Sequence, residues 1–176
     1  MKEKIKTFKQ VVKIARQLKK EGKRIVFCHG VFDILHKGHV TLLAEAKKLG
    51  DILVVGVDCD ENARILKGPG RPINEGWARM FVLAHLEPVD FVFLIPSFKG
   101  VKNIHDFYDK FYLELRPDFV ATCVKAGKHG HFKKMHAEAC GAKFVDIKNS
   151  IYDKTTTKTI ELLGERGLRS LKSLKV

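Results

Sequence analysis

Apolar positions along the chain follow two alternating patterns. Runs of consecutive apolar residues predict buried strands at 25–27, 51–57, 90–95, 119–124 and 143–147. Helical spacing predicts helices at 8–22, 38–49, 75–86, 101–115 and 131–140, and a last helix that begins near residue 156. Strands that alternate with helices are typical of a parallel sheet covered on both faces. The pattern therefore predicts an α/β, Rossmann-like, doubly wound sheet of five parallel strands.

The same pattern divides the chain into one domain and a short tail. We expect residues 1–163 to form a single domain that opens with an N-terminal helix within residues 1–22. Residues 164–176 are basic and lack an apolar period, and we expect them to be a C-terminal tail without a packed core.

Two segments carry more specific structural expectations. Residues 61–74 are polar and include Gly68, Pro69, Gly70 and Pro72, which predicts a long loop of the kind that usually binds something. On the helix at 75–86, the apolar side is expected to hold these residues: Trp77, Met80, Phe81, Leu83 and Ala84.

Charge narrows the class of partner. The chain has 33 Lys and Arg against 20 Asp and Glu, a formal net charge of +13. This excess favours an anionic partner, although charge alone does not separate a nucleic acid from a triphosphate or a sugar phosphate. Many of the lysines of the first helix are expected simply to coat a solvated face.

The cysteines argue against a disulfide-stabilised fold. Cys28, Cys59, Cys123 and Cys140 show no CxxC spacing, and no apolar N-terminal segment resembles a signal peptide or a membrane span. We therefore expect a protein of the reducing cytoplasm, with no membrane partner.

Candidate chemistry is concentrated where the first strand leads into the next helix. His36 and His39 lie at this junction, separated by Lys37 and Gly38. Unpaired N–H groups and the dipole at a helix start favour an anion, and Gly38 would let a phosphate approach the backbone closely. In doubly wound sheets, ligands bind at the carboxyl ends of the strands. The sequence therefore predicts a phosphate site there.

The run from Gly30 to His39, GVFDILHKGH, resembles the G-x-F-D-x-x-H-x-G-H signature of the cytidylyltransferase-like nucleotidyltransferases, the HIGH superfamily. The branch that contains heptose-phosphate enzymes and glycerol-3-phosphate cytidylyltransferases also shares three later segments in order. These are Lys67-Gly68 with Arg71-Pro72-Ile73-Asn74, then Arg79, then the run from Thr155 to Lys158. The resemblance covers about residues 24–163 and implies the same fold.

The resemblance implies transfer of a nucleoside monophosphate unit from ATP or CTP to a phosphorylated small molecule, a sugar or polyol phosphate, with release of pyrophosphate. It implies that His36 and His39 contact the α-phosphate, and that Lys67 and Arg79 contact the β- and γ-phosphates. Further nucleotide-binding positions are Gly30, Val31, Phe32, Asp33, Gly38, Arg71, Thr155, Thr156, Thr157 and Lys158. Among them, Asp33 is expected to orient a backbone turn or a histidine. Magnesium would bridge the phosphates, held mainly by substrate and water.

The acceptor side departs from the family pattern. Relatives carry an acidic element after the fourth strand, where this chain has the basic run 123–128, CVKAGK. A more anionic acceptor is therefore expected. Candidate acceptor-binding residues are His29, Asp58, Lys125 and Lys128, and Lys133 and Lys134 would suit extra phosphate or carboxylate groups or form a solvated basic face. His129, His131, His136 and Cys140 have metal-ligand spacing, but phosphate binding explains the histidines equally well, and no metal site is assigned.

Several alternatives stay open. The heptose-phosphate branch favours ATP as the donor, whereas the glycerol-3-phosphate branch favours CTP. Adenylylation of flavin mononucleotide, as in a related family, is another interpretation. The charge and the basic tail leave room for a non-catalytic relative that binds a nucleotide or a nucleic acid. Homodimers are common among such relatives, but no surface can be assigned to an interface.

Overall fold

The computed structural model describes residues 2–124, 130–148, 156 and 158–164. In this part of the chain, five strands form one parallel sheet in the order β3-β2-β1-β4-β5. The strands are β1 (Ile25–Gly30), β2 (Ile52–Asp58), β3 (Phe91–Ile95), β4 (Phe119–Thr122) and β5 (Lys143–Asp146). The predicted α/β fold with five parallel strands is confirmed, with strand ends shifted by up to three residues.

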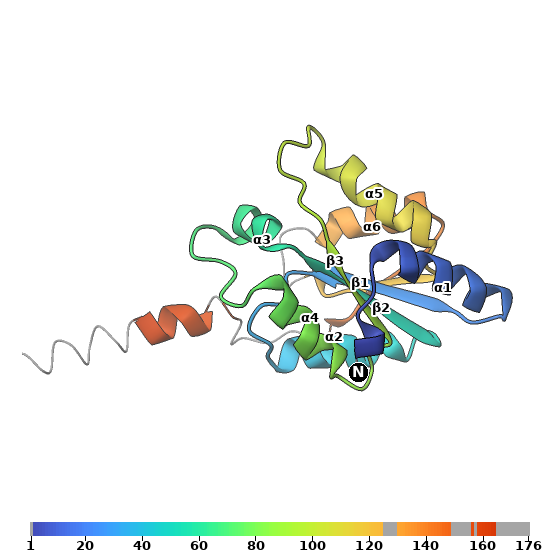
Figure 1. Ribbon diagram of the computed structural model, residues 1–176, viewed down its shortest axis with the longest axis horizontal. Helices are drawn as coiled ribbons and strands as arrows, with labels where there is room; N and C mark the ends of the chain where they lie inside the picture. Colours follow the sequence, from blue (N-terminus) through green and yellow to red (C-terminus); the bar gives the residue numbers. More distant parts are fainter. Residues whose placement is uncertain (1, 125–129, 149–155, 157, 165–176) are drawn as a thin grey trace, which may run out of the picture.

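Helices cover both faces of the sheet (Figure 1). After a 3-10 turn at Lys2–Lys4, they are α1 (Phe8–Lys20), α2 (Lys37–Lys47), α3 (Asp60–Lys67), α4 (Gly76–Ala84), α5 (Ile104–Leu115) and α6 (Gly130–Ala139). Helices α1, α5 and α6 contribute to the hydrophobic core on one face, and α2 and α4 to the core on the other. Residues 158–164 are also helical.

The first four residues of the central strand β1 show why this part of the sequence is apolar without interruption. Ile25 and Phe27 enter the core beneath α1 and α5, whereas Val26 and Cys28 enter the core beneath α2 and α4. All four side chains are at most 1 % exposed. Alternate side chains of a strand point to opposite faces, so a strand buried on both faces needs an apolar residue at every position.

The strand order reverses between β1 and β4. The chain runs from β1 outward through β2 to β3, then returns to place β4 on the other side of β1. The loops that leave β1 and β4 therefore diverge at the carboxyl edge of the sheet and leave a crevice in which such folds bind ligands. This topology places the segment after β1, with both candidate histidines, beside the crevice.

The opposite, amino edge is held by aspartates. Asp118 Oδ2 accepts a hydrogen bond from the Ile25 amide at 2.7 Å, and Asp90 Oδ2 accepts one from the Leu53 amide at 2.6 Å. Lys19 pairs with Asp118 at 2.9 Å, and Lys47 pairs with Asp90. These carboxylates satisfy strand amides that would otherwise lack a partner at the start of the ladder.

The predicted loop over 61–74 is wrong in its first half, because α3 spans Asp60–Lys67. Asp60 and Glu61 lie in the first turn of this helix and Arg64 and Lys67 in the last, the arrangement that the helix dipole favours. Asn62 and Ala63 are its buried residues, so one short stripe faces the core. The loop is limited to 68–75.

The prediction for the helix at 75–86 is also partly wrong. Met80, Leu83 and Ala84 are buried, but the side chains of Trp77 and Phe81 are 51 % and 47 % exposed. Helix α4 lies over β2 and the edge strand β3, so only part of its apolar surface meets the sheet. The predicted basic tail lies largely outside the described residues.

No helix in the described ranges is long and apolar enough to cross a membrane. All four cysteines are free thiols, as their spacing predicts.

The contribution of the amino-edge aspartates to stability can be tested without altering the carboxyl edge. We expect Asp118→Ala to lower the free energy of unfolding by about 1–3 kcal/mol, because it leaves the buried Ile25 amide without an acceptor. Lys19→Ala removes the partly exposed ion pair and an exposed hydrogen bond to the Arg116 carbonyl oxygen, and should cost less than about 1 kcal/mol. Urea unfolding of both variants checks this, and equal losses would contradict it.

Candidate functional site

A strained turn carries the chain from β1 to α2. Phe32 has a φ of +47°, in the left-handed region that a bulky side chain rarely adopts. Its ring is 5 % exposed and packs in the core beneath α2 and α4. Burial of the ring stabilises this conformation, and the turn directs the following residues back over the carboxyl edge to the start of α2.

His36 and His39 come together at the N-terminus of α2. His36 is the N-cap residue, and its carbonyl oxygen accepts a hydrogen bond from the His39 amide at 2.9 Å. The two imidazole rings stack with centroids 3.9 Å apart and planes 22° from parallel. The ring of Phe32 meets His39 edge-on at 5.4 Å. Both imidazoles therefore lie where the helix dipole favours an anion.

Burial makes both histidines neutral near pH 7. It lowers the pKa of His36, and it lowers the pKa of His39 to about 3, with smaller contributions from the charges of His36 and Lys67. His39 Nδ1 is buried and has no hydrogen-bond partner among the described residues. A neutral imidazole carries one N–H donor, so the pair is suited to hydrogen-bond an anion without adding full charge.

Asp33 holds the loop at 68–75 against the turn that follows β1. Its side chain is 1 % exposed, and the carboxylate accepts hydrogen bonds from the amides of Ile73 and Asn74 at 2.9 and 3.0 Å. It also pairs with the guanidinium of Arg71 at 3.0 Å. Asp33 therefore orients a backbone turn, as expected. The guanidinium of Arg71 pairs with this carboxylate and is largely removed from solvent.

Arg79 lies deeper than the sequence suggests. Its side chain is 1 % exposed, and its guanidinium donates to the carbonyl oxygens of Asn74 and Val31 and to Asp60 Oδ1 at 2.7 Å. These acceptors come from the loop at 68–75, the turn after β1 and the start of α3. The guanidinium therefore positions these three segments, and its expected contact with the β- and γ-phosphates stays a prediction.

Three other candidates for nucleotide binding are among the described residues, namely Lys67, Thr156 and Lys158. Lys67 is the last residue of α3, and its charge acts on both His39 and Lys133. Thr156 is buried and its hydroxyl donates to the Ile34 carbonyl oxygen at 3.0 Å, so the segment near 156 touches this turn. Lys158 is exposed in the helical segment 158–164. Thr155 and Thr157 lie outside the described residues.

Gly30 and Gly38 are the two remaining nucleotide-binding candidates of the first motif. Gly30 is the last residue of β1, and Gly38 lies in the first turn of α2. Gly38 is buried, and His36 precedes it at the helix start. The motif residues therefore enclose one turn at the carboxyl edge, as the strand-to-helix pattern predicts.

Polar side chains on the α5 and α6 face form a second cluster. His29, at the end of β1, shares a 2.8 Å hydrogen bond between its Nε2 and the Tyr112 hydroxyl. The Tyr108 hydroxyl donates to Asp58 Oδ1, at the end of β2, at 2.7 Å. Burial lowers the pKa of His29 well below its ordinary value and raises that of Asp58. Lys133 of α6 donates to the His29 carbonyl oxygen.

Sequence reasoning did not find the two tyrosines of this cluster. Tyr108 and Tyr112 are four residues apart on α5, which is a detectable spacing, but only the fold aligns them with β1 and β2. Of the other predicted acceptor residues, Lys125 and Lys128 lie outside the described residues.

The histidine-rich segment makes other contacts. His136 Nδ1 lies 2.6 Å from Asp109 Oδ1, and the Cys140 thiol donates to the Ala137 carbonyl oxygen at 3.2 Å. His131 stacks on Phe132, and His129 is not among the described residues. In the described ranges, no group of three or more His, Cys, Asp or Glu side chains is arranged to hold a metal ion.

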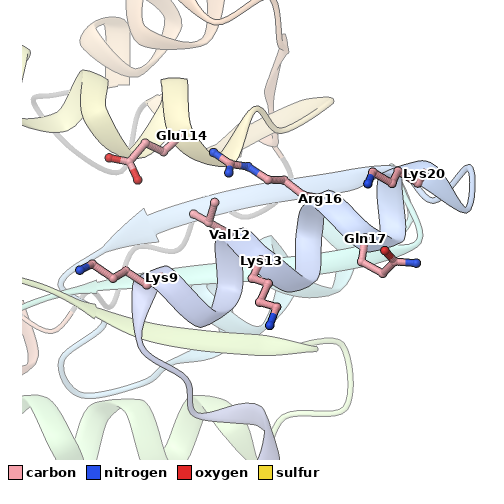
Figure 2. A pocket seen from close by; sticks show the side chains of 7 residues that line it. All are labelled: Lys9, Val12, Lys13, Arg16, Gln17, Lys20 and Glu114. Carbon is pink, nitrogen blue, oxygen red and sulfur yellow. The ribbon is translucent and has the colours of Figure 1, made fainter.

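A depression of about 520 Å³ lies elsewhere, along α1 where α5 flanks it (Figure 2). It is lined by Lys9, Val12, Lys13, Arg16, Gln17, Lys20 and Glu114. Helix α1 ends near Asp118, which precedes β4, so this hollow extends toward the amino edge of the sheet. Its side chains are those of a solvated basic helix face, and the carboxyl edge remains the candidate site.

Comparison with known proteins identifies the family that this chain resembles. The family model described as cytidylyltransferase-like matches residues 27–159, which include most of β1, all of β2 to β5 and all the motif segments. The bifunctional protein HldE of a Nitratiruptor species is 52 % identical over 157 residues, 89 % of this chain and 31 % of the relative. HldE of Sulfurimonas denitrificans is 40 % identical over 158 residues, 89 % of this chain and 30 % of the relative. The chain thus spans about a third of these relatives.

Two solved structures are similar in fold. One is the lipopolysaccharide core biosynthesis protein from Thermoplasma volcanium, with a TM-score of 0.52 and 33 % identity, covering 75 % of this chain and all of that one. The other is a pantoate-beta-alanine ligase from Francisella tularensis, with a TM-score of 0.60 and 18 % identity. It covers 81 % of this chain and 65 % of the ligase, and it supports the fold alone.

The Asp33 carboxylate gives a first test of the site. We expect Asp33→Asn to weaken ATP binding and to lower the free energy of unfolding by about 1–3 kcal/mol, because an amide cannot accept all the hydrogen bonds to Ile73, Asn74 and Arg71. Calorimetry and urea unfolding measure the two effects. Asp106→Asn, at an exposed position in the first turn of α5, is the control: its amide oxygen can still accept from Asn103, so ATP binding should be unchanged and the free energy of unfolding should change by less than about 1 kcal/mol. Wild-type values in both variants would contradict the role of Asp33.

The histidine pair gives a second test. A bound polyphosphate should raise the depressed pKa values of His36 and His39 toward the ordinary value, so binding near pH 6 takes up protons. Affinity should then increase as the pH falls from about 8 to about 6. Calorimetry with ATP in two buffers of different ionisation enthalpy measures the uptake, which should diminish in His39→Asn. Absence of proton uptake by the wild-type protein near pH 6 would contradict this assignment.

Proposed function

This chain belongs to the cytidylyltransferase-like family of nucleotidyltransferases, and we propose that it transfers a nucleoside monophosphate unit from ATP or CTP to a phosphorylated small molecule. The acceptor in this proposal is a sugar or polyol phosphate, and pyrophosphate is released. The observation that carries the proposal is the stacked pair of neutral imidazoles, His36 and His39, at the start of α2 beside the crevice.

The reaction needs no protein nucleophile. An oxygen of the acceptor phosphate attacks the α-phosphorus and forms the new P–O bond. The anhydride bond between the α- and β-phosphates breaks, and pyrophosphate leaves with its electron pair. Because both reactants are anions, catalysis depends on placing them in line and on stabilising the charge that develops on the α-phosphate and the leaving group.

The described side chains divide this work. His36 and His39 donate N–H groups to the α-phosphate from the helix N-terminus. Lys67, exposed at the end of α3, neutralises the phosphates that leave. Arg79 and Asp33 are positioning residues, because their contacts bind protein segments together.

Magnesium, when bound with the triphosphate, would supply further charge neutralisation. Each nearby carboxylate already has a protein partner: Asp33 has Arg71, Asp58 has Tyr108, and Asp60 has Arg79. Among the described residues there is no cluster to hold the ion. In this proposal the phosphate oxygens and water hold it, and no step assigned to the protein depends on it.

A sugar phosphate is the acceptor class best supported by the relatives. The Thermoplasma volcanium structure is that of a lipopolysaccharide core biosynthesis protein, and lipopolysaccharide cores consist of sugars. The structure aligns over that protein's whole length. Sugar phosphates also suit the mixture of hydroxyl, imidazole and ammonium groups in the second cluster.

Pyrophosphate release tests the proposed function. ATP and CTP are each incubated with sugar phosphates, polyol phosphates and flavin mononucleotide, and acceptor-dependent pyrophosphate is measured. We expect His36→Ala and His39→Ala each to lower the rate roughly 100- to 1000-fold, because each removes a donor to the developing charge. His85→Ala, at an exposed histidine that ends α4, is the control and should retain the wild-type rate. Full activity in the two site variants would contradict the assignment.

A further inference from the structure

The second polar cluster contains one group that its protein contacts do not explain. His29, Asp58 and Thr122 end three neighbouring strands, β1, β2 and β4, and are each at most 8 % exposed. His29 and Asp58 have hydroxyl partners on α5, from Tyr112 and Tyr108. The remaining group is Lys133 of α6, which reaches the same edge.

The Lys133 ammonium contacts only neutral oxygens among the described residues. Nζ donates to the His29 carbonyl oxygen, and it lies 3.4 Å from the Thr122 hydroxyl. In the described part of the chain it forms no ion pair with a carboxylate, although Asp58 lies close enough to interact electrostatically. Burial lowers the pKa of Lys133, as expected for an ammonium removed from water. A desolvated cation without a counter-ion is costly to a fold, and an anionic ligand would compensate it.

The His29 imidazole, near the end of β1, is a second group that its protein contacts do not fully explain. His29 Nδ1 is buried and has no hydrogen-bond partner in the described ranges. Its ring is held between neighbours, stacked on Tyr108 at 5.0 Å and on Phe27 at 5.5 Å. The ring therefore has a defined orientation, with one nitrogen bound to Tyr112 and the other available to a ligand.

The position of Lys133 relates it to the donor half of the site. Its two oxygen partners belong to β1 and β4, the strands between which the order reverses. Its charge interacts with that of Lys67, which in turn acts on His39. An anion bound at Lys133 would therefore lie at the crevice, on the same carboxyl edge as the histidine pair.

We propose that Lys133 binds the phosphate group of the acceptor and presents it to the α-phosphorus, while His29 Nδ1 contacts a hydroxyl of the same molecule. This inference rests on the proposed function. It makes Lys133 a residue that selects phosphomonoesters over uncharged sugars. An acceptor that offers only a hydroxyl would leave the partly buried Lys133 ammonium without a counter-ion and would bind poorly.

The neighbouring lysine provides a matched control. Lys134 follows Lys133 on α6, but it is exposed and pairs at 3.7 Å with Glu138 on the solvent side. Lys133→Met and Lys134→Met therefore remove the same charge from adjacent positions of one helix. Lys133→Arg keeps the charge and shows whether a cation, rather than the alkyl chain, is required at this position.

The experiment measures the KM for the acceptor and the Kd for ATP separately. With the sugar phosphate that supports turnover, we expect Lys133→Met to raise the acceptor KM roughly 10- to 100-fold, as for loss of a charged hydrogen bond. The Kd for ATP should stay within about twofold of wild type. Lys133→Arg should recover most of the acceptor affinity, and Lys134→Met should match the wild-type protein. If Lys133 only fastened α6 to the sheet, Lys133→Met would lower the unfolding free energy and leave the acceptor KM unchanged, which overturns the inference.

A binding measurement separates this inference from the proposed function. Inorganic phosphate is titrated into the protein saturated with a non-hydrolysable ATP analogue, and backbone amide shifts near β4 and α6 are followed by NMR. Binding that Lys133→Met abolishes and Lys134→Met retains supports the inference, even if no acceptor is ever turned over. Turnover of a sugar phosphate with no phosphate shift that depends on Lys133 overturns the inference and leaves the proposed function intact.

Discussion

The buried guanidinium of Arg79 is the interaction on which the shape of the site depends. A cation with a side chain only 1 % exposed is stable in a fold when its donors meet well-placed acceptors. Arg79 finds them on Val31, Asn74 and Asp60, which belong to segments that are otherwise separate. The Asp33 carboxylate then ties the same loop back to the turn after β1. The positions of His36 and His39 follow from this framework, because they end the turn that Arg79 and Asp33 hold.

The two edges of the sheet carry different ionisable groups. At the amino edge, Asp118 and Asp90 accept strand amides and pair with lysines, so these negative charges are neutralised in structural contacts. At the carboxyl edge, neutral imidazoles lie near Lys67 and Lys133. These groups favour an anion at the carboxyl edge. The net charge of +13 predicts an anionic partner, and the start of α2 with its imidazoles is where we propose that it binds.

The errors of sequence-based prediction have physical causes. The segment 60–67 reads as a loop because it is short and polar, yet contacts of Asn62 with Pro96 and Phe98 hold α3 in place. Trp77 and Phe81 fit a helical apolar period, but the period does not reveal that α4 lies near the edge strand β3 and leaves part of its apolar surface uncovered. Both errors concern which elements pack against each other in the folded protein, and local sequence patterns do not reveal this.

The sequence by itself determined the order of the strands and of the helices other than α3, the doubly wound parallel sheet and the position of His36 and His39 at a strand-to-helix junction. These features depend on residues close together in the chain, where apolar period and helix-start chemistry act directly. Only the tertiary structure decided that Arg79 meets Val31, that Tyr108 meets Asp58 and that Lys133 meets His29. These partners are 48, 50 and 104 residues apart. Such contacts follow from the strand order and the packing of α5 and α6, because side chains separated by whole elements become neighbours only when the sheet is assembled.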